Sequence, residues 1–342
     1  MAQQYDKWKV VEQIGQGGQA KALRVFDEND SEKKPFVLKR LSNLKRLSRF
    51  EKEVRAGLEL SHPNILKIVD KNLDHKSPYF VAEYCPNGAL EFDKLAGLSV
   101  VERLRMFSAI CRGVGHDHEK GFTHRDLKPD NIFLRGDMTP VVGDFGLCFI
   151  TEEGDRVTML DEQVGSRWYM APELAHGMAE DVTPAADVYS LGKVLYWMLA
   201  GRPFDREEHR NPKFDLTKGQ TAPDIFFIYD LLDRMIEHDP GKRFANASEV
   251  ADAVDETIKL IEVKAHLLDL KVPQQCNYCG RGLYKPVADT TSLTDRSGVT
   301  DVHNFGFTIM GRPLMLILVC DYCSNVQMFR PDYSGNRGAW KK

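Results

Sequence analysis

Hydrophobic and polar residues form short strand-like patterns near the start of the chain. Residues Trp8–Ile14, Ala20–Phe26 and Phe36–Arg40 have this pattern, and the glycines at 15–18 and the polar segment 27–34 separate them. From Ser42 to Leu60 apolar residues recur at steps of three and four, which predicts an amphipathic helix that Ser42 could cap. These patterns predict a small sheet with one helix.

Helical periods dominate the next part of the chain, from about residue 86 to 268. Val100–His118 and Val188–Ala200 are examples, and the loops around 124–172 are rich in Asp, Gly and Pro. The composition changes near Lys271, and a stretch rich in Gly, Thr and Asp then lies between two pairs of cysteines. We therefore expect a mainly helical lobe and, over 271–342, a separate small unit.

Composition narrows the classes of protein. The 342 residues suffice for two or three cores, and a net charge of -4 gives no general attraction to nucleic acid or anionic membranes. The start of the chain has no apolar segment typical of a signal peptide, and the longest apolar run, Leu314 to Cys320, is much shorter than the ~18–20 residues that span a bilayer. We expect a cytoplasmic protein without membrane insertion.

A glycine cluster lies between the first two predicted strands, in Gly15-Gln-Gly-Gly-Gln-Ala20. Backbone N–H groups of such a turn can approach phosphate oxygens closely because no Cβ intervenes. Taken alone, a glycine turn between strands is more often an ordinary hairpin. Downstream, however, a strand lysine at Lys39, a helical Glu53, the segment His124-Arg-Asp-Leu-Lys-Pro-Asp-Asn131 and Asp144-Phe-Gly follow in order.

Taken together, these motifs resemble the eukaryotic-type (Hanks-type) serine/threonine protein kinase family from about Tyr5 to Leu268. The resemblance implies an α+β bilobal protein kinase fold, with a small antiparallel sheet lobe plus one helix at about 1–85 and a larger helical lobe at about 86–268. It also implies Mg²⁺ (or Mn²⁺) and ATP as cofactors, protein substrates with Ser or Thr, and autophosphorylation.

The resemblance assigns roles to individual residues. Lys39 would hold the ATP phosphates and pair with Glu53, for which Glu51 is a nearby alternative; Asn131 and Asp144 would bind the metal ions, and Asp126 would orient the substrate hydroxyl, with Lys128 beside it. The full set implied to bind ATP is Gly15, Gln16, Gly17, Gly18, Ala20, Ala22, Val37, Lys39, Ala82, Glu83, Cys85 and Phe133. Glu173, Asp187 and Arg243 would support the site, with Glu173 and Arg243 forming an ion pair.

Some positions depart from the family pattern. Ala20 replaces the third glycine of the phosphate loop, and Ala22 replaces a valine above the adenine, while Val37 and Phe133 are larger than usual and could compensate. Ala82 takes the gatekeeper position before the hinge, and we expect a back pocket for bulky purine-like inhibitors. Cys85 and Cys148 are candidate reactive thiols or small buried fillers.

The activation segment predicts how the activity is regulated. Arg125 marks kinases that are switched by a phosphate in this loop, and Asp161 and Glu162 precede Ser166 where the phosphosite usually lies. We hypothesise that these two carboxylates partly replace the phosphate and leave basal activity. Two threonines remain candidates for autophosphorylation, Thr151 and Thr158.

Two Cys-x-x-Cys pairs lie near the C-terminus, and they predict one tetrahedral zinc site. The ligands would be Cys276, Cys279, Cys320 and Cys323. Redox-active or disulfide-bonded cysteines are the alternative. The module looks like a zinc ribbon, a fold that binds protein or nucleic-acid partners, and its tail at Arg337 to Lys342 combines cations with a tryptophan.

Three functions remain open from the sequence. An active kinase with a partner-recognising zinc module is favoured by the complete set of predicted catalytic residues. A pseudokinase scaffold that binds nucleotide without turnover is the second, and a nucleic-acid binder regulated by the kinase fold is the third. Nothing in the sequence defines an oligomeric state.

Overall fold

The structure is a computed structural model of the chain. It describes residues 4–16, 20–144, 168–175, 182–216, 225–269, 276, 278–279, 281, 284–286, 308–309, 312–313, 316–320, 322–323 and 326–329. The chain divides into two compact units, Met1–Val254 and Asp255–Lys342, and the division falls inside helix α7 (Ala247–Asp269). The domain boundary that we expect at 268–271 remains a prediction.

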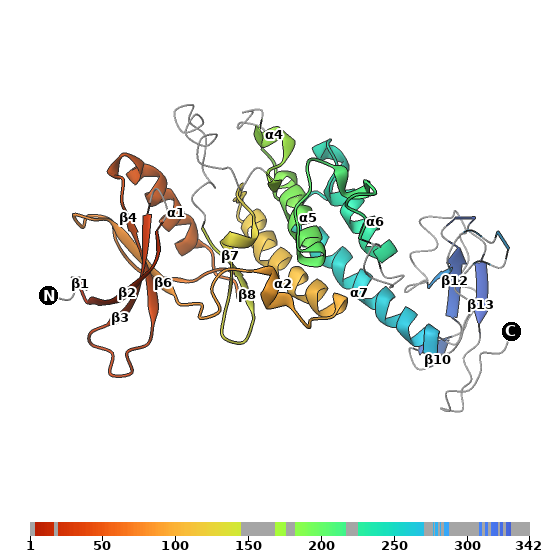
Figure 1. The fold of residues 1–342 in the computed structure, drawn as a ribbon, viewed down its shortest axis with the longest axis horizontal. Helices are drawn as coiled ribbons and strands as arrows, with labels where there is room; N and C mark the ends of the chain where they lie inside the picture. Colours follow the sequence, from red (N-terminus) through yellow and green to blue (C-terminus); the bar gives the residue numbers. More distant parts are fainter. Residues whose placement is uncertain are drawn as a thin grey trace. The chain divides into compact units, whose positions relative to one another are not determined.

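The N-terminal part of the first unit is an antiparallel sheet with strand order β1-β2-β3-β4-β6-β5 (Figure 1). Its strands are β1 (Gln4–Tyr5), β2 (Trp8–Gln16), β3 (Ala20–Asp27), β4 (Phe36–Leu41), β5 (Ile68–Asn72) and β6 (Tyr79–Glu83). The three strands with a clear sequence pattern are present. We call residues 4–83, which include helix α1 (Leu47–Glu59), the sheet lobe.

Successive residues of β6 point to opposite faces of the sheet, and each face packs against other residues. Tyr79 and Val81 pack with Trp8 and other residues of β1–β4 in one buried cluster. Phe80 and Ala82 pack on the other face in a cluster that includes Phe50 and Val54 of α1. The apolar residues of α1 therefore hold the helix on the sheet, as their three- and four-residue spacing predicts.

The predicted cap of this helix is wrong. Asn43, not Ser42, accepts a hydrogen bond from the backbone N–H of Lys45 and caps a short 3-10 turn, Leu44–Arg46. Helix α1 itself begins only at Leu47. The short amide side chain of Asn43 is well suited to this role, and the sequence pattern alone did not distinguish it from its neighbour.

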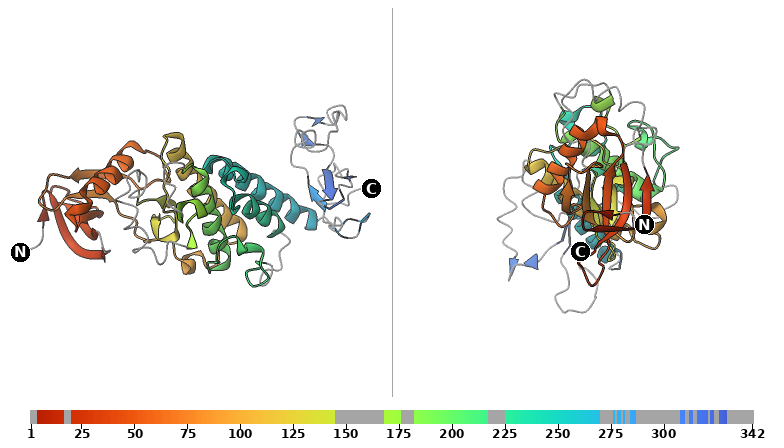
Figure 2. Two further views of the ribbon diagram at one scale, coloured as in Figure 1. Left: turned by 90° about the horizontal axis from the view of Figure 1, so that it is seen from above. Right: turned by 90° about the vertical axis from the view of Figure 1, so that its left-hand side faces the viewer.

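The remainder of the first unit, residues 90–254, is mainly helical, and we call it the helical lobe. Its elements are η2 (Phe92–Leu95), α2 (Val100–Glu119), η3 (Pro129–Asn131), β7 (Ile132–Leu134), β8 (Pro140–Val142), α4 (Pro172–Ala175), α5 (Ala185–Ala200), η6 (Glu208–Arg210), α6 (Ile225–Met235), η7 (Pro240–Lys242) and the start of α7. Helices α2, α5 and α6 lie side by side (Figure 2).

Helix α5 forms the centre of the helical lobe. Nearly all of its residues are buried, and Gly192 packs so closely on α6 that an added Cβ would lie 2.8 Å from the Cβ of Met235. Gly201 ends α5 with a φ of 70°, a conformation that glycine adopts at little cost. The rigid α5 therefore gives the lobe a fixed base for the loops at its N-terminal end.

The second unit contains short strands in its described part. Strands β9 (Tyr284–Pro286), β12 (Leu316–Cys320) and β13 (Val326–Phe329) form a three-stranded antiparallel sheet in the order β13-β12-β9. Strands β10 (Thr308–Ile309) and β11 (Arg312–Pro313) pair separately. This agrees with the predicted small β module. Among the helices that the structure describes, none is long and apolar enough to cross a membrane.

Candidate functional site

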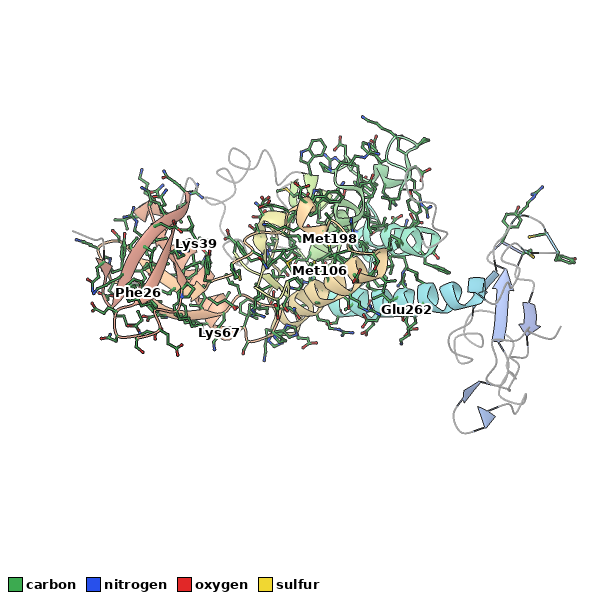
Figure 3. All side chains as sticks on the ribbon, turned by 60° about the horizontal axis from the view of Figure 1, so that its bottom comes forward. Phe26, Lys39, Lys67, Met106, Met198 and Glu262 are labelled. Carbon is green, nitrogen blue, oxygen red and sulfur yellow. The ribbon has the colours of Figure 1, made fainter. Side chains whose placement is uncertain are left out.

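Lys39 brings together three distant parts of the chain. It lies on β4 and is labelled in Figure 3. Its Nζ is 2.6 Å from Oε1 of Glu53 on α1 and 3.1 Å from Oδ1 of Asp144, which follows β8. Glu53 is buried whereas Glu51 is exposed. The structure therefore pairs Lys39 with Glu53 rather than with Glu51.

The two neighbouring carboxylates keep the Lys39 side chain in its charged form. Burial disfavours the charged lysine, but the carboxylates of Asp144 and Glu53 outweigh burial and hold the pKa of Lys39 above its ordinary value. Burial likewise favours the neutral acid at Asp144, and the nearby Lys39 ammonium nevertheless holds the pKa of that carboxyl below its usual range. A cation is thus fixed beside two anions, one from each lobe.

The loop before β7 holds the second group of candidate residues. Nζ of Lys128 is 2.9 Å from Oδ2 of Asp126, and Nδ2 of Asn131 donates to Oδ2 and to the backbone oxygen of Asp126, at 3.0 and 2.8 Å. Asn131 and the carboxylate of Asp126 are thereby held in one orientation. Because the amide nitrogen of Asn131 faces Asp126, its oxygen is the atom with metal-ligand character.

Asp187 holds the backbone of the loop before β7 in place. The buried Asp187 carboxylate, at the start of α5, accepts the backbone N–H groups of His124 and Arg125 at 2.7 and 2.8 Å. Arg125 has a φ of 67°, a left-handed conformation that costs free energy for a residue with a Cβ. The two hydrogen bonds to Asp187 hold that conformation in place.

Two histidines complete this support, and neither role was predicted from the sequence. Nε2 of His118 lies 2.9 Å from Oδ2 of Asp187, while its Nδ1 accepts the backbone N–H of Ala247 at 3.1 Å. This assigns the proton to Nε2. His124 is buried, with Nε2 3.1 Å from the backbone oxygen of Gly143. The only sequence signal was a second histidine six residues before His124, at the end of a predicted helix.

Glu173 and Arg243 form the ion pair that the sequence suggests. The pair is bidentate, with nitrogen–oxygen distances of 2.7 and 3.0 Å, and the Arg243 side chain is fully buried. The guanidinium also donates to the backbone oxygens of Ala185, Glu237 and His238. Arg243 thus ties the segment around α4 to the start of α5.

The described part of the predicted nucleotide pocket lies on β2–β4, β6 and β7. Gly15 pairs with Ala22, and Val37 pairs with Ala82, so the members of each pair lie opposite each other on adjacent strands. Gln16 and Ala20 end β2 and begin β3, and Phe133 lies half-buried on β7. Gly17 and Gly18 lie outside the described residues. The inhibitor pocket behind Ala82 stays a prediction.

Cys85 behaves as a buried filler. It is buried at the hinge, and burial together with the nearby Glu83 carboxylate raises the pKa of its thiol to about 12. A thiol with this pKa carries almost no thiolate at neutral pH and is a poor nucleophile. Several other predicted residues lie outside the described part of the chain: Cys148, Thr151, Thr158, Asp161, Glu162 and Ser166.

Three of the four predicted zinc ligands come together in the second unit. The Sγ atoms of Cys276, Cys279 and Cys323 all lie within 4.8 Å of one another, and Cys276 and Cys323 are 3.7 Å apart. The fourth, Cys320, ends strand β12, and the position of its side chain is outside the described atoms. Chain segments separated by more than 40 residues therefore converge on one cysteine cluster.

Comparisons with known proteins identify relatives of the first unit. The protein kinase domain family matches residues 8–255. A probable serine/threonine-protein kinase of Clostridium acetobutylicum is 28% identical over 278 residues, which are 72% of this chain and 39% of that protein. The probable serine/threonine-protein kinase PknB of Lactococcus lactis is 30% identical over 207 residues, 58% of this chain and 32% of that protein.

A vertebrate relative is similar over a comparable region. The maternal embryonic leucine zipper kinase of Danio rerio is 32% identical over 244 residues, which are 69% of this chain and 36% of that protein. The chain therefore spans between 32% and 39% of the length of these three curated relatives.

The buried Arg243 is the basis of a stability prediction. Replacing it by Met leaves Glu173 and three backbone oxygens without their donors, and we expect a loss of about 3–5 kcal/mol in the free energy of unfolding. Arg55→Met is the matched control, because Arg55 makes one exposed ion pair with Glu59 and should cost at most about 1 kcal/mol. Urea unfolding measures both, and equal losses would contradict the assigned role of Arg243.

The lowered pKa of Asp187 predicts that the free energy of unfolding depends on pH. Burial favours its neutral form, yet the hydrogen bond from His118 and the other groups around it hold the pKa of Asp187 below its ordinary value of about 3.9. Its contribution is therefore complete above that ordinary value and is lost as the pH falls through the folded-state pKa. We expect the stability difference between wild type and Asp187→Asn to shrink as the pH falls from about 4 toward the folded-state pKa.

Urea unfolding at a series of pH values tests this expectation. The control is Asp252→Asn, the same substitution at a side chain that is 75% exposed. A difference for Asp187→Asn that stays constant down to pH 3 would show that the carboxylate is not held ionised by its neighbours.

Proposed function

The chain belongs to the protein kinase family, and from this premise we propose that it is a serine/threonine protein kinase that transfers the γ-phosphate of ATP to protein hydroxyls. The contact of Lys39 with both Glu53 and Asp144 carries the proposal, since it sets a cation and a metal-binding carboxylate beside the loop of Asp126. The names of the similar proteins from Clostridium acetobutylicum and Lactococcus lactis support serine/threonine specificity.

The residues at the site fit Mg²⁺ and ATP. Magnesium prefers oxygen ligands, and the Asp144 carboxylate and the Asn131 amide oxygen are of this kind. Lys39 would bind phosphate oxygens, and the small residues Gly15, Ala22 and Ala82 leave room for the base. When bound, Mg-ATP supplies the phosphoryl group and neutralises much of its charge.

Asp126 and Lys128 act on the protein substrate in this proposal. Asp126 orients the attacking hydroxyl and accepts its proton, since its carboxylate is held by Asn131. Lys128, now 2.9 Å from Asp126, stabilises negative charge on the transferring group. Asp187 and His118 keep the backbone of the loop in place, so little reorganisation is needed during the reaction.

Regulation by the activation segment is part of the same proposal. Autophosphorylation at Thr151 or Thr158, and partial replacement of a phosphate by Asp161 and Glu162, would both act through Arg125. Activity that depends fully on phosphorylated Thr158, with Asp161→Asn/Glu162→Gln silent, would overturn the second idea.

Transfer of labelled phosphate tests the proposed activity. We expect Asp126→Asn to lower kcat by about 10²–10⁴-fold while ATP still binds, because the variant keeps the shape of the site and loses the proton acceptor. Generic basic protein and the chain itself serve as substrates, and mass spectrometry identifies the modified residues. Asp252→Asn is the matched control, since the same substitution on an exposed helix residue should not change kcat.

A pseudokinase scaffold is the alternative, and the same assay separates the two. Wild type and Asp126→Asn that bind ATP equally and transfer no phosphate to any protein tested would favour the scaffold. Phosphotyrosine as the main product would contradict serine/threonine specificity.

We also propose that the cysteine cluster binds one structural zinc ion. Zinc–sulfur bonds of about 2.3 Å in a tetrahedron place the sulfurs about 3.8 Å apart, and the Cys276–Cys323 separation of 3.7 Å agrees with this spacing. A disulfide would require about 2.05 Å. Cys320 is the fourth ligand in this proposal, and the module would recognise a protein or nucleic-acid partner.

Metal analysis tests the zinc proposal. Purified protein should contain about one zinc ion per chain, and Cys276→Ser or Cys323→Ser should lose it because three thiolates bind zinc more weakly than four. Cys111→Ala, in the kinase unit, is the control and should retain it. Zinc content near zero in wild type, together with loss of free thiols that dithiothreitol restores, would favour a redox pair.

A further inference from the structure

An ion pair at the hinge joins the two lobes outside the catalytic residues. Arg135 follows strand β7 of the helical lobe, and Glu83 ends strand β6 of the sheet lobe. Nε and Nη2 of Arg135 donate to the two carboxylate oxygens of Glu83, each at 2.8 Å. Nη1 donates to the backbone oxygen of Pro63 at 2.6 Å, so all three guanidinium nitrogens have acceptors.

The backbone around Lys67 completes the junction. The N–H of Lys67, a residue labelled in Figure 3, donates to Oε1 of Glu83 at 2.9 Å, and the N–H of Glu83 donates to the Lys67 oxygen at 2.9 Å. One carboxylate thus receives three donors from two segments. Burial favours its neutral form, but the hydrogen bonds from Arg135 and Lys67 hold the pKa of Glu83 below its ordinary value, so the bonds are charge-assisted.

These contacts fasten the end of the sheet lobe to elements of the helical lobe. The segment that contains Pro63 and Lys67 is itself bound to β8, because the N–H of Leu66 donates to Val142 at 2.8 Å. The far end of the hinge is also fixed, since Leu134 donates to Gly88 and Leu90 donates to Ile132, at 2.8 and 2.7 Å. Only residues 84–87 lie between Glu83 and Gly88, the two anchored ends.

Register within the sheet connects this junction to the catalytic lysine. Glu83 pairs with Phe36 and Phe80 pairs with Lys39 in the β4–β6 ladder. The position of Glu83 therefore determines where β4 carries Lys39, and with it the approach of Lys39 to Asp144. Rotation of the sheet lobe about the hinge would have to break the contacts of Glu83 first.

We propose that Glu83 and Arg135 form a clamp that sets the angle between the two lobes, and that Arg135 is a positioning residue for phosphoryl transfer. The inference rests on the proposed kinase activity. With the clamp closed, Lys39 reaches Glu53 and Asp144 together, so the clamp supports the arrangement that binds nucleotide and metal.

The geometry separates this pair from an ordinary surface ion pair. The side chains of Arg135 and Glu83 are 28% and 23% exposed, and partly exposed single contacts of this kind often contribute little. Here the contact is bidentate, and both partners make additional hydrogen bonds to backbone from other segments. Loss of the Arg135–Glu83 contact would therefore loosen the hinge between the lobes and not only a surface side chain.

The experiment compares Arg135→Met with a matched control, Arg210→Met. Arg210 also makes a bidentate pair, with Asp233, but both residues lie within the helical lobe. We expect Arg135→Met to lower kcat/KM for ATP about tenfold. Arg210→Met should stay within about twofold of wild type, because it removes the same chemistry without releasing the hinge.

Hydrogen exchange supplies a readout that does not require activity. Amides 84, 85 and 87–89 should exchange faster in Arg135→Met than in wild type, while those of α5 should not change. This result separates failure of the clamp from failure of the proposed enzyme activity, since an inactive protein would still report hinge protection. Unchanged exchange at the hinge in Arg135→Met would overturn the proposal.

A double-mutant cycle with Glu83→Gln tests whether the two residues act together. If they form one clamp, the double variant should lose no more of kcat/KM than the worse single variant. A fold-loss of kcat/KM in the double variant equal to the product of the two single fold-losses would overturn the proposal. So would an equal loss in Arg210→Met, because it would show that removing any such ion pair impairs the enzyme.

Discussion

A half-buried ammonium group between two carboxylates is the constraint on which the site depends. Lys39 comes from β4, Glu53 from α1 and Asp144 from the segment after β8. An unpaired charge in such surroundings would be costly, so the three segments gain stability by meeting. Their meeting orients α1 against the sheet and brings the sheet lobe to the helical lobe at the place where phosphate chemistry is proposed.

Buried anchors give the catalytic loop its shape. The backbone N–H groups of His124 and Arg125 in this loop donate to the carboxylate of Asp187. Asp187 in turn starts the buried helix α5 and is held by His118. The strained φ of Arg125 is held by the hydrogen bond from its own backbone N–H to Asp187. Rigid helices thus support a site made of loops.

The second unit differs from the first in its elements, since its described part contains short strands and a cysteine cluster. Three thiols converge from segments far apart in the sequence, at a spacing that suits a tetrahedral metal ion. Strands β12 and β13 have five and four residues, and in our proposal a metal ion at the cysteine cluster contributes much of the free energy of folding. The first unit, by contrast, contains an extensive buried apolar core.

The sequence by itself determined the kinds of residue and their order. Lysine on a strand, glutamate on a helix and the Asp126 to Asn131 segment could be identified because their order along the chain resembles the motifs of the protein kinase family. Helix α1 could be identified from its apolar period. Tertiary structure decided which groups meet. It selected Glu53 over Glu51 by burial, placed His118 between Asp187 and Ala247, and joined Glu83 to Arg135, 52 residues away. No local pattern encodes such contacts, because they depend on how separate elements pack and on which polar groups that packing buries.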